Sequence, residues 1–238
     1  MKLHDNMKSH DWNRPFQEAN MNETADRVRI VDVQVLSDDW YVLKKITFDY
    51  RRADGSWQRL NREAYDRGNG ATLLLYEPER RTVVLTRQFR LPAFVNGHDG
   101  MLIEAPGGLL EAASPEERIR AEVEEETGYR VHAVRKVFEA FMSPGSVTEK
   151  LFFFVAEYTA TAKVGDGGGI ASEGEDIEVL ELSIEEALAM VQRGEIVDGK
   201  TIMLLQYAAL NLVGGVEVAG RGVARSVRLS SDQNRRAP

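Results

Sequence analysis

The stretch AEVEEETGY, residues 121–129, combines clustered carboxylates with a closing glycine. Side chains three and four apart share one face of a helix, so Glu122, Glu125 and Glu126 are expected to lie together. Like charges on one face repel, and a divalent cation would turn that repulsion into a set of ligands. Hard cations such as Mg²⁺ prefer carboxylate oxygens, backbone carbonyls and water. The alternative interpretation is an exposed charged face ended by an ordinary glycine C-cap.

The element that must carry these carboxylates is a helix predicted over residues 114–128. Ser114 is placed to cap its start, with Pro115 at the first helical position and Glu117 completing a capping box. Gly128 is expected to end it. The preceding glycine loop APGG, residues 105–108, allows close backbone approach and can offer a carbonyl to the same ion. The two segments together predict a metal site.

The segment GGLLEAASPEERIRAEVEEETGY, residues 107–129, resembles a Nudix box. This is the loop–helix–loop motif of hydrolases that cleave nucleoside diphosphates linked to another group. The second half of the motif is matched by Glu122, Val123, Glu125, Glu126 and Gly128.

The first half of the motif departs from the family pattern. Counted from Gly108 the loop is one residue short, Ala113 stands where the pattern has glutamate, and Ala121 stands where it has arginine. Arg120 points about 100° around the helix from that position and cannot simply substitute. These departures leave open a Nudix-fold module without catalytic activity.

The wider chain resembles one branch of the superfamily, the GDP-mannose pyrophosphatases, which share the shortened loop and the lost arginine. The matching blocks, spread over residues 28–212, are YDRGNGAT (65–72), RQFR (87–90), VNG (95–97), FMSPGSVTE (141–149), GEDIEVLEL (174–182) and GEIVDGKT (194–201). The related ADP-ribose pyrophosphatases fit these blocks less closely.

The resemblance implies a magnesium site, with Mn²⁺ as a possible substitute. Its first ligands would be Glu122, Glu126 and the backbone carbonyl of Gly107. Glu125 would bind a second ion or orient the first ligands.

A later acidic loop, GDGGGIASEGED at residues 165–176, is implied to complete the site. Glu175 would be a further ligand and Glu173 the general base, although the two roles can be exchanged. The glycines would let the loop close over the substrate. The alternative is a flexible acidic surface loop.

The resemblance also implies a set of substrate-binding side chains, namely Trp40, Arg62, Glu63, Arg67, Arg90, Glu149 and Lys200. Arg90 suits phosphate binding and Trp40 suits stacking on guanine. In similar enzymes the N-terminal unit is exchanged between two subunits, so Arg62 and Glu63 would reach the partner's site. Several of these side chains could instead be plain surface charges or core aromatics.

The pattern of elements predicts an α+β fold with a mixed sheet between helices. Asp54-Gly55 indicates a hairpin inside a three-stranded antiparallel unit over residues 28–65. Further strands are expected within 71–90, 100–108, 134–144, 149–159 and 177–182, and helices over 183–195, with a capping box from Ser183 to Glu186, and 201–213. By the resemblance, this is a Nudix-type α/β/α sandwich. The predicted organisation is a tail (1–26), an N-terminal β unit (27–66), a Nudix domain (67–213) and a second tail (214–238).

Composition narrows the function further. The net charge of −8 argues against non-specific nucleic-acid binding. If the protein binds phosphates, a divalent cation must offset the repulsion between their charge and that of the protein. The absence of cysteine excludes disulfides and thiolate chemistry and fits a reducing compartment. No apolar run is long enough to span a bilayer, and we expect a cytoplasmic protein.

The resemblance, together with these observations, implies a Mg²⁺-dependent nucleotide-sugar diphosphatase that acts as a homodimer and cleaves GDP-mannose to GMP and mannose 1-phosphate. The enzymatic alternative is hydrolysis of ADP-ribose or another ADP-sugar. The alternative of a different class is a regulator that binds a nucleotide sugar without cleaving it.

Overall fold

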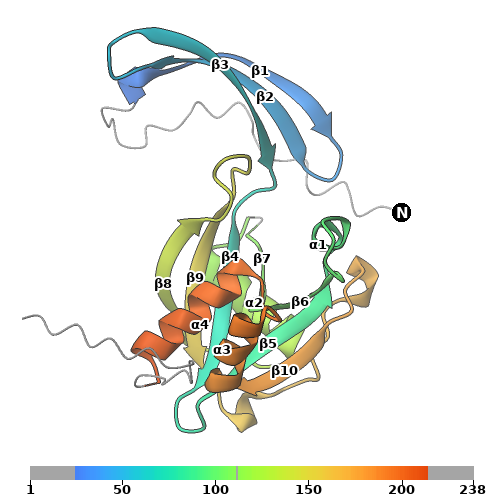
Figure 1. Ribbon diagram of the computed structural model, residues 1–238. Coiled ribbons are helices and arrows are strands. Elements are labelled where there is room, and N and C mark those ends of the chain that lie inside the picture. The colour runs from blue at the N-terminus through green and yellow to red at the C-terminus, as the bar shows by residue number, and fades with distance from the viewer. Residues whose placement is uncertain (1–24, 111, 214–238) are drawn as a thin grey trace, which may run out of the picture. The chain divides into compact units, whose positions relative to one another are not determined.

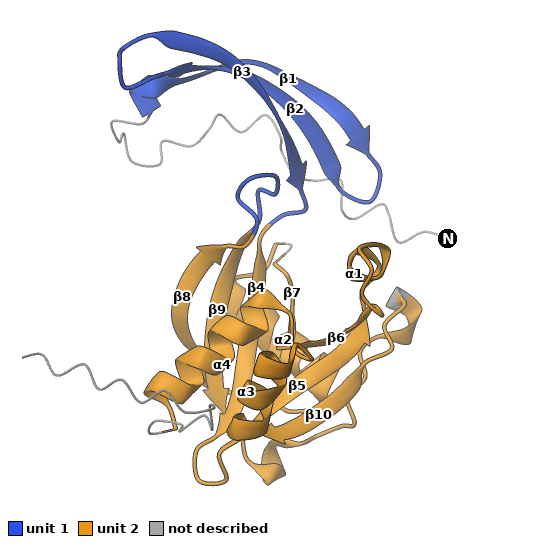
Figure 2. Ribbon diagram, in the orientation of Figure 1, with its two compact units in different colours: residues 1–68, 143–149 blue, residues 69–142, 150–238 orange. Residues whose placement is uncertain are grey.

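The protein is described here by a computed structural model covering residues 25–110 and 112–213 (Figure 1). Both predicted tails therefore lie almost wholly outside the described residues. The chain forms two compact units (Figure 2). Unit 1 contains the described residues up to Gly68 together with Ser143–Glu149, and unit 2 contains Asn69–Met142 and the residues from Lys150 onward.

Unit 1 is an antiparallel sheet of three strands in the order β1-β2-β3, as the sequence predicts. Its elements are the 3₁₀ turn η1 (Ala25–Arg27), β1 (Val28–Asp38), β2 (Val42–Arg51) and β3 (Trp57–Asp66). The predicted hairpin joins β2 to β3, and Gly55 adopts the positive φ of 86° that such a turn requires.

None of the described residues of unit 1 is buried. Strand β1 exposes a run of large apolar side chains, namely Ile30, Val31, Val33, Val35 and Leu36, each at least 42% exposed. A three-stranded sheet normally gains its stability by burying one apolar face. Neither face of this sheet is buried within the described chain, so the apolar side chains of β1 form an exposed surface of the kind that commonly binds another protein.

Unit 2 is built on a seven-stranded mixed sheet whose main path is β10-β5-β4-β9-β8, with β6 paired to β5 and β7 paired to β4. Strands β4 and β9 run parallel and the other pairs are antiparallel. The strands are β4 (Gly70–Glu77), β5 (Thr82–Phe89), β6 (Met101–Glu104), β7 (Gly107–Leu109), β8 (Arg135–Phe141), β9 (Lys150–Glu157) and β10 (Glu178–Ser183).

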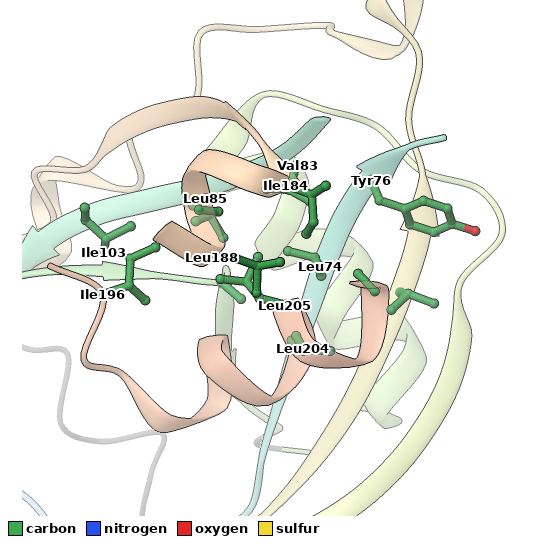
Figure 3. Packing of buried hydrophobic residues seen from close by; sticks show 14 of the residues in the cluster. Leu74, Tyr76, Val83, Leu85, Ile103, Ile184, Leu188, Ile196, Leu204 and Leu205 are labelled. Atoms are coloured by element: carbon green, nitrogen blue, oxygen red, sulfur yellow. The ribbon is translucent and has the colours of Figure 1, made fainter. Parts of the chain in front are cut away.

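Helices cover both faces of this sheet. The helical elements are α1 (Leu91–Val95), α2 (Pro115–Thr127), η2 (Ala160–Ala162), η3 (Ala171–Glu173), α3 (Ile184–Arg193) and α4 (Gly199–Asn211). On one face α3 and α4 bury Ile184 and Leu204 against Leu74 of β4 (Figure 3). On the other face α2 buries Ile119 and Val123. The predicted α/β/α sandwich is therefore confirmed.

The structure differs from the sequence prediction at three local points. The double glycine is not a loop, because Gly107–Leu109 forms strand β7, and a Cβ at Gly107 would lie only 2.5 Å from the Ala71 carbonyl oxygen. The capping box predicted at Ser183 forms only in part, since Ser183 accepts from the Glu186 backbone but the Glu186 carboxylate pairs with Arg193. The short helix α1 was not predicted. Across the described part of the chain, no helix is both long and apolar enough to span a bilayer.

Candidate active site

Helix α2 is fixed at both ends as predicted. Ser114 Oγ accepts a hydrogen bond from the Glu117 backbone at 3.3 Å, and the Glu117 carboxylate accepts one from the Ser114 backbone at 3.2 Å. Gly128 ends the helix with φ of 75°, and its N–H donates to the Glu124 carbonyl at 2.9 Å. The rotation of the helix is set by the burial of Ile119 and Val123, and this places the acidic face.

Two of the three predicted acidic ligands are buried on α2. Glu122 is 6% exposed and Glu126 is 2% exposed, whereas Glu125 is half-buried. Glu126 Oε2 has no hydrogen-bond partner among the described residues. Burial and the charge of Glu122 raise the pKa of the Glu126 carboxyl well above its usual value, and Glu175 and Glu104 add to this rise.

A buried, unpartnered carboxylate oxygen among like charges fits a divalent cation. No set of three or more His, Asp or Glu side chains within the described residues is gathered as a complete metal site. This does not conflict with magnesium, because Mg²⁺ keeps several waters and is commonly held by one or two carboxylates together with substrate phosphates. Strand β7, which carries the predicted Gly107 carbonyl, packs beside α2.

Gly108 is what allows β7 to lie so close to Glu122. A Cβ at position 108 would lie 2.0 Å from Glu122 Oε1 and 2.3 Å from its carboxyl carbon. The space of a methyl group is therefore taken by the carboxylate. The role of Gly108 is therefore steric, because any side chain at this position would collide with the Glu122 carboxylate.

Arg118 contributes a contact that the sequence analysis missed. Its Nη2 pairs with Glu122 Oε1 one turn later, and its Nε donates to the Leu109 carbonyl of β7 at 3.1 Å. The side chain that neutralises Glu122 comes from the preceding helical turn.

A second group of charges surrounds Glu104, at the end of β6. Arg90 Nε donates to Glu104 Oε2 at 2.6 Å, and Lys200 Nζ donates to Glu104 Oε1. Lys200 also pairs with Asp198, the N-cap of α4, at 3.0 Å. The structure thus brings together Arg90 and Lys200, both predicted to bind substrate, around a buried carboxylate that was not predicted. The signal in the sequence that could have indicated Glu104 is its place as a charged residue at the end of the apolar run MLIE, residues 101–104.

Of these two cations, Arg90 also acts on the acidic face of α2. Burial lowers the pKa of the Arg90 guanidinium, but the charges of Glu104 and Glu126 outweigh that effect and raise it above its usual value. Arg90, which follows the C-terminal end of β5, therefore brings positive charge toward Glu126 of α2. Arg87 pairs with Glu178 of the neighbouring strand at 3.4 Å.

The glycine-rich loop is bound to the end of α2. Gly168 N–H donates to the Glu126 carbonyl at 2.9 Å, and Gly169 N–H donates to the Glu125 carbonyl at 3.2 Å. Ile170 N–H donates to Glu175 Oε2 at 2.8 Å. The glycine half of the loop therefore satisfies the last carbonyls of the helix, and closure of the loop over the substrate stays a prediction. The side chain of Glu173 lies outside the described residues.

The remaining predicted residues lie in unit 1. Arg67 Nε lies 3.4 Å from Glu149 Oε1, and the Arg67 guanidinium lies 5.5 Å from the centre of the Tyr41 ring. Trp40 is 69% exposed and meets Tyr41 edge to face. The structure brings Arg67 and Glu149 together, whereas Arg62 and Glu63 are exposed on β3.

Comparison with known proteins identifies the family of this chain. A family model described as the NUDIX domain matches residues 66–205. The chain belongs to the Nudix family. A second family model, described as the GDP-mannose pyrophosphatase NudK N-terminal domain, matches residues 27–65.

Close relatives of this Nudix protein carry one name. A protein named GDP-mannose pyrophosphatase from Pectobacterium atrosepticum is 56% identical and is aligned over 77% of this chain and 94% of its own. One of the same name from Klebsiella pneumoniae is 55% identical, over 76% and 90% of the two chains. These relatives confirm the resemblance read from the sequence.

A solved structure shows the same fold at low identity. The crystal structure of an ADP compounds hydrolase superposes with a TM-score of 0.61 at 13% identity, covering 77% of this chain and 93% of its own. At this identity the likeness bears on the fold alone.

Proposed function

We propose that this Nudix hydrolase cleaves the diphosphate of a nucleotide sugar, and that GDP-mannose is converted to GMP and mannose 1-phosphate. The observation that carries the proposal is the match of both parts of the chain, at 51–56% identity, to relatives named GDP-mannose pyrophosphatase. The buried carboxylates of α2 and the cations around Glu104 supply the charge pattern that a metal-bound diphosphate needs.

The metal in this proposal is Mg²⁺, with Mn²⁺ as a substitute. Glu122, Glu126, Glu175 and the Gly107 carbonyl would hold it, and Glu125 would orient the ligands or bind a second ion. When bound, such an ion offsets the charge of the diphosphate and favours the ionised form of a water molecule.

The other steps fall to the protein's own side chains. Arg90 and Lys200 bind the diphosphate oxygens, and their contacts with Glu104 hold them in place before substrate arrives. Glu173 or Glu175 accepts the proton of the attacking water. The water oxygen bonds to one phosphorus as the bond from that phosphorus to the bridging oxygen breaks, so one product phosphate gains the water oxygen and the other leaves with the bridging oxygen.

The homodimer and the base-binding residues complete the proposal. Covering the exposed apolar strand β1 with a second copy would bury the side chains that unit 1 leaves in solvent. Arg62 and Glu63 would then face the partner's substrate, Arg67 and Glu149 would contact the nucleotide sugar, and Trp40 would stack on guanine. The lack of cysteine supports a cytoplasmic location.

The test is a panel of GDP- and ADP-sugars incubated with the purified protein and Mg²⁺, with release of nucleoside monophosphate as the readout. We expect GMP release from GDP-mannose, its loss in EDTA and its recovery with Mg²⁺ or Mn²⁺. Faster cleavage of ADP-ribose would overturn the substrate assignment. Binding of the sugars without turnover of any would favour the non-catalytic regulator. A Glu126→Gln variant with full activity would refute the metal site.

A further inference from the structure

Arg118 joins two parts of the candidate metal site. One arm of its guanidinium pairs with Glu122 Oε1, and its Nε donates to the Leu109 carbonyl of β7. The side chain is 28% exposed and that of Glu122 is 8% exposed, so the pair is partly shielded from water. The carbonyl contact fixes the guanidinium beside the strand that also carries Gly107 and Gly108.

The contact offsets a repulsion between carboxylates that arises when no cation is bound at the site. Glu122 and Glu126 are both buried, and their mutual repulsion contributes to the raised pKa of Glu126. Arg90 is committed to Glu104 by a 2.6 Å contact. Arg118 places a positive charge directly on Glu122, where a divalent ion would otherwise supply it.

The geometry points to Arg118 as the internal counter-ion of Glu122, which stabilises the cation-free site and lowers its affinity for divalent ions. The inference rests on the metal site of the proposed function. A cation that ligates Glu122 must share the carboxylate with the guanidinium, and the two positive charges repel. Because the coupling between two interactions at one site is reciprocal, any part of the Arg118–Glu122 interaction that a bound cation weakens lowers the affinity for that cation by the same free energy.

This chain has Ala121 where the family pattern has arginine, so the motif position itself supplies no positive charge. In this chain the guanidinium that pairs with Glu122 belongs to Arg118, one helical turn before Glu122, and not to the residue directly beside it. An arginine at that place reaches β7 as well as the carboxylate. The divalent-ion affinity is therefore set by a residue outside the recognised motif positions.

The test compares Arg118→Gln with Arg120→Gln in the full-length protein. Arg120 lies on the same helix with similar exposure, but its partner is the exposed Glu116 at 3.9 Å. Two quantities are measured: the Mn²⁺ dissociation constant by calorimetry without substrate, and the melting temperature in EDTA and in Mg²⁺.

For Arg118→Gln we expect Mn²⁺ binding to tighten by about fivefold, the lower end of typical couplings between sites. The melting temperature in EDTA should fall and its rise on adding Mg²⁺ should grow, whereas Arg120→Gln should leave both unchanged. Unchanged or weaker Mn²⁺ binding in Arg118→Gln overturns the inference, as does the same change in both variants. Absence of Mn²⁺ binding by the wild-type protein would count against the metal site itself, and GMP release by the wild type tests the hydrolase separately.

Discussion

Replacing Gly108 by alanine tests whether the position of Glu122 controls catalysis. The new Cβ would lie 2.0 Å from Glu122 Oε1, whereas ordinary van der Waals contact begins near 3.4 Å. The carboxylate must therefore retreat by the difference, about 1.4 Å. The atoms that collide are the far end of a side chain, so the fold should survive while the candidate ligand moves.

A displacement of this size has a large kinetic effect. Misplacing a catalytic group by about 1 Å can cost roughly 100-fold in rate. A 100-fold loss corresponds to about 2.7 kcal/mol of transition-state stabilisation. We therefore expect kcat/KM of Gly108→Ala for GDP-mannose to fall by about two orders of magnitude, with a higher Mg²⁺ concentration needed for half-maximal activity.

The assay is steady-state release of GMP over a range of Mg²⁺ concentrations, with melting temperature as the measure of folding. Gly165→Ala is the matched control, because its new Cβ meets nothing within 4 Å and its φ is not positive. The reasoning is refuted if Gly108→Ala keeps kcat/KM within about threefold of the wild type, since a loss of roughly 100-fold is expected.

Three further predictions concern the charges and the start of α2. Because the pKa of Glu126 is raised, stability in EDTA should fall as pH rises above 4.5, the usual value for the group. Glu126→Gln should remove that fall in melting curves and abolish hydrolysis; an unchanged pH profile would contradict this. Glu104→Gln leaves Arg90 and Lys200 beside a neutral group and should cost about 3 kcal/mol in urea unfolding, and a loss below about 1 kcal/mol would argue against it. Ser114→Ala should cost about 1 kcal/mol without changing kcat, and a lower kcat would show that the cap also positions the site.

The features predicted correctly from sequence are those fixed by local chemistry. Ser114, Glu117 and Gly128 specify both ends of α2, and the spacing of Glu122 and Glu126 follows from helical geometry. The strands of unit 2 were recognisable from their apolar runs, and the α/β/α order followed from the resemblance. The caps, the spacing of the glutamates and the apolar runs depend on neighbours close in the chain, whereas the α/β/α order does not.

Two of the features that were missed depend on contacts between distant segments, whereas the missed pair of Arg118 and Glu122 is local to α2. Glu104 and Lys200 are 96 residues apart in the chain, and nothing in the local pattern joins them. The bond from Gly168 to Glu126 likewise pairs a loop with a helix end, so composition suggested flexibility where backbone hydrogen bonds bind the loop. Both contacts join segments that only the tertiary fold brings together, and local sequence patterns do not give that arrangement.

The pairing between β3 and the segment Ser143–Glu149 has a consequence for synthesis on the ribosome. Tyr65 exchanges backbone hydrogen bonds with Ser146 and Thr148, and the Asp66 carboxylate accepts a side-chain hydrogen bond from the Thr148 hydroxyl, 82 residues later. At translation rates of roughly 5–20 residues per second, the end of β3 waits about 4–16 seconds for these partners. Unit 1 therefore cannot be completed by a nascent chain that stops before residue 143. Its closing segment arrives only after most of the strands of unit 2 have been made.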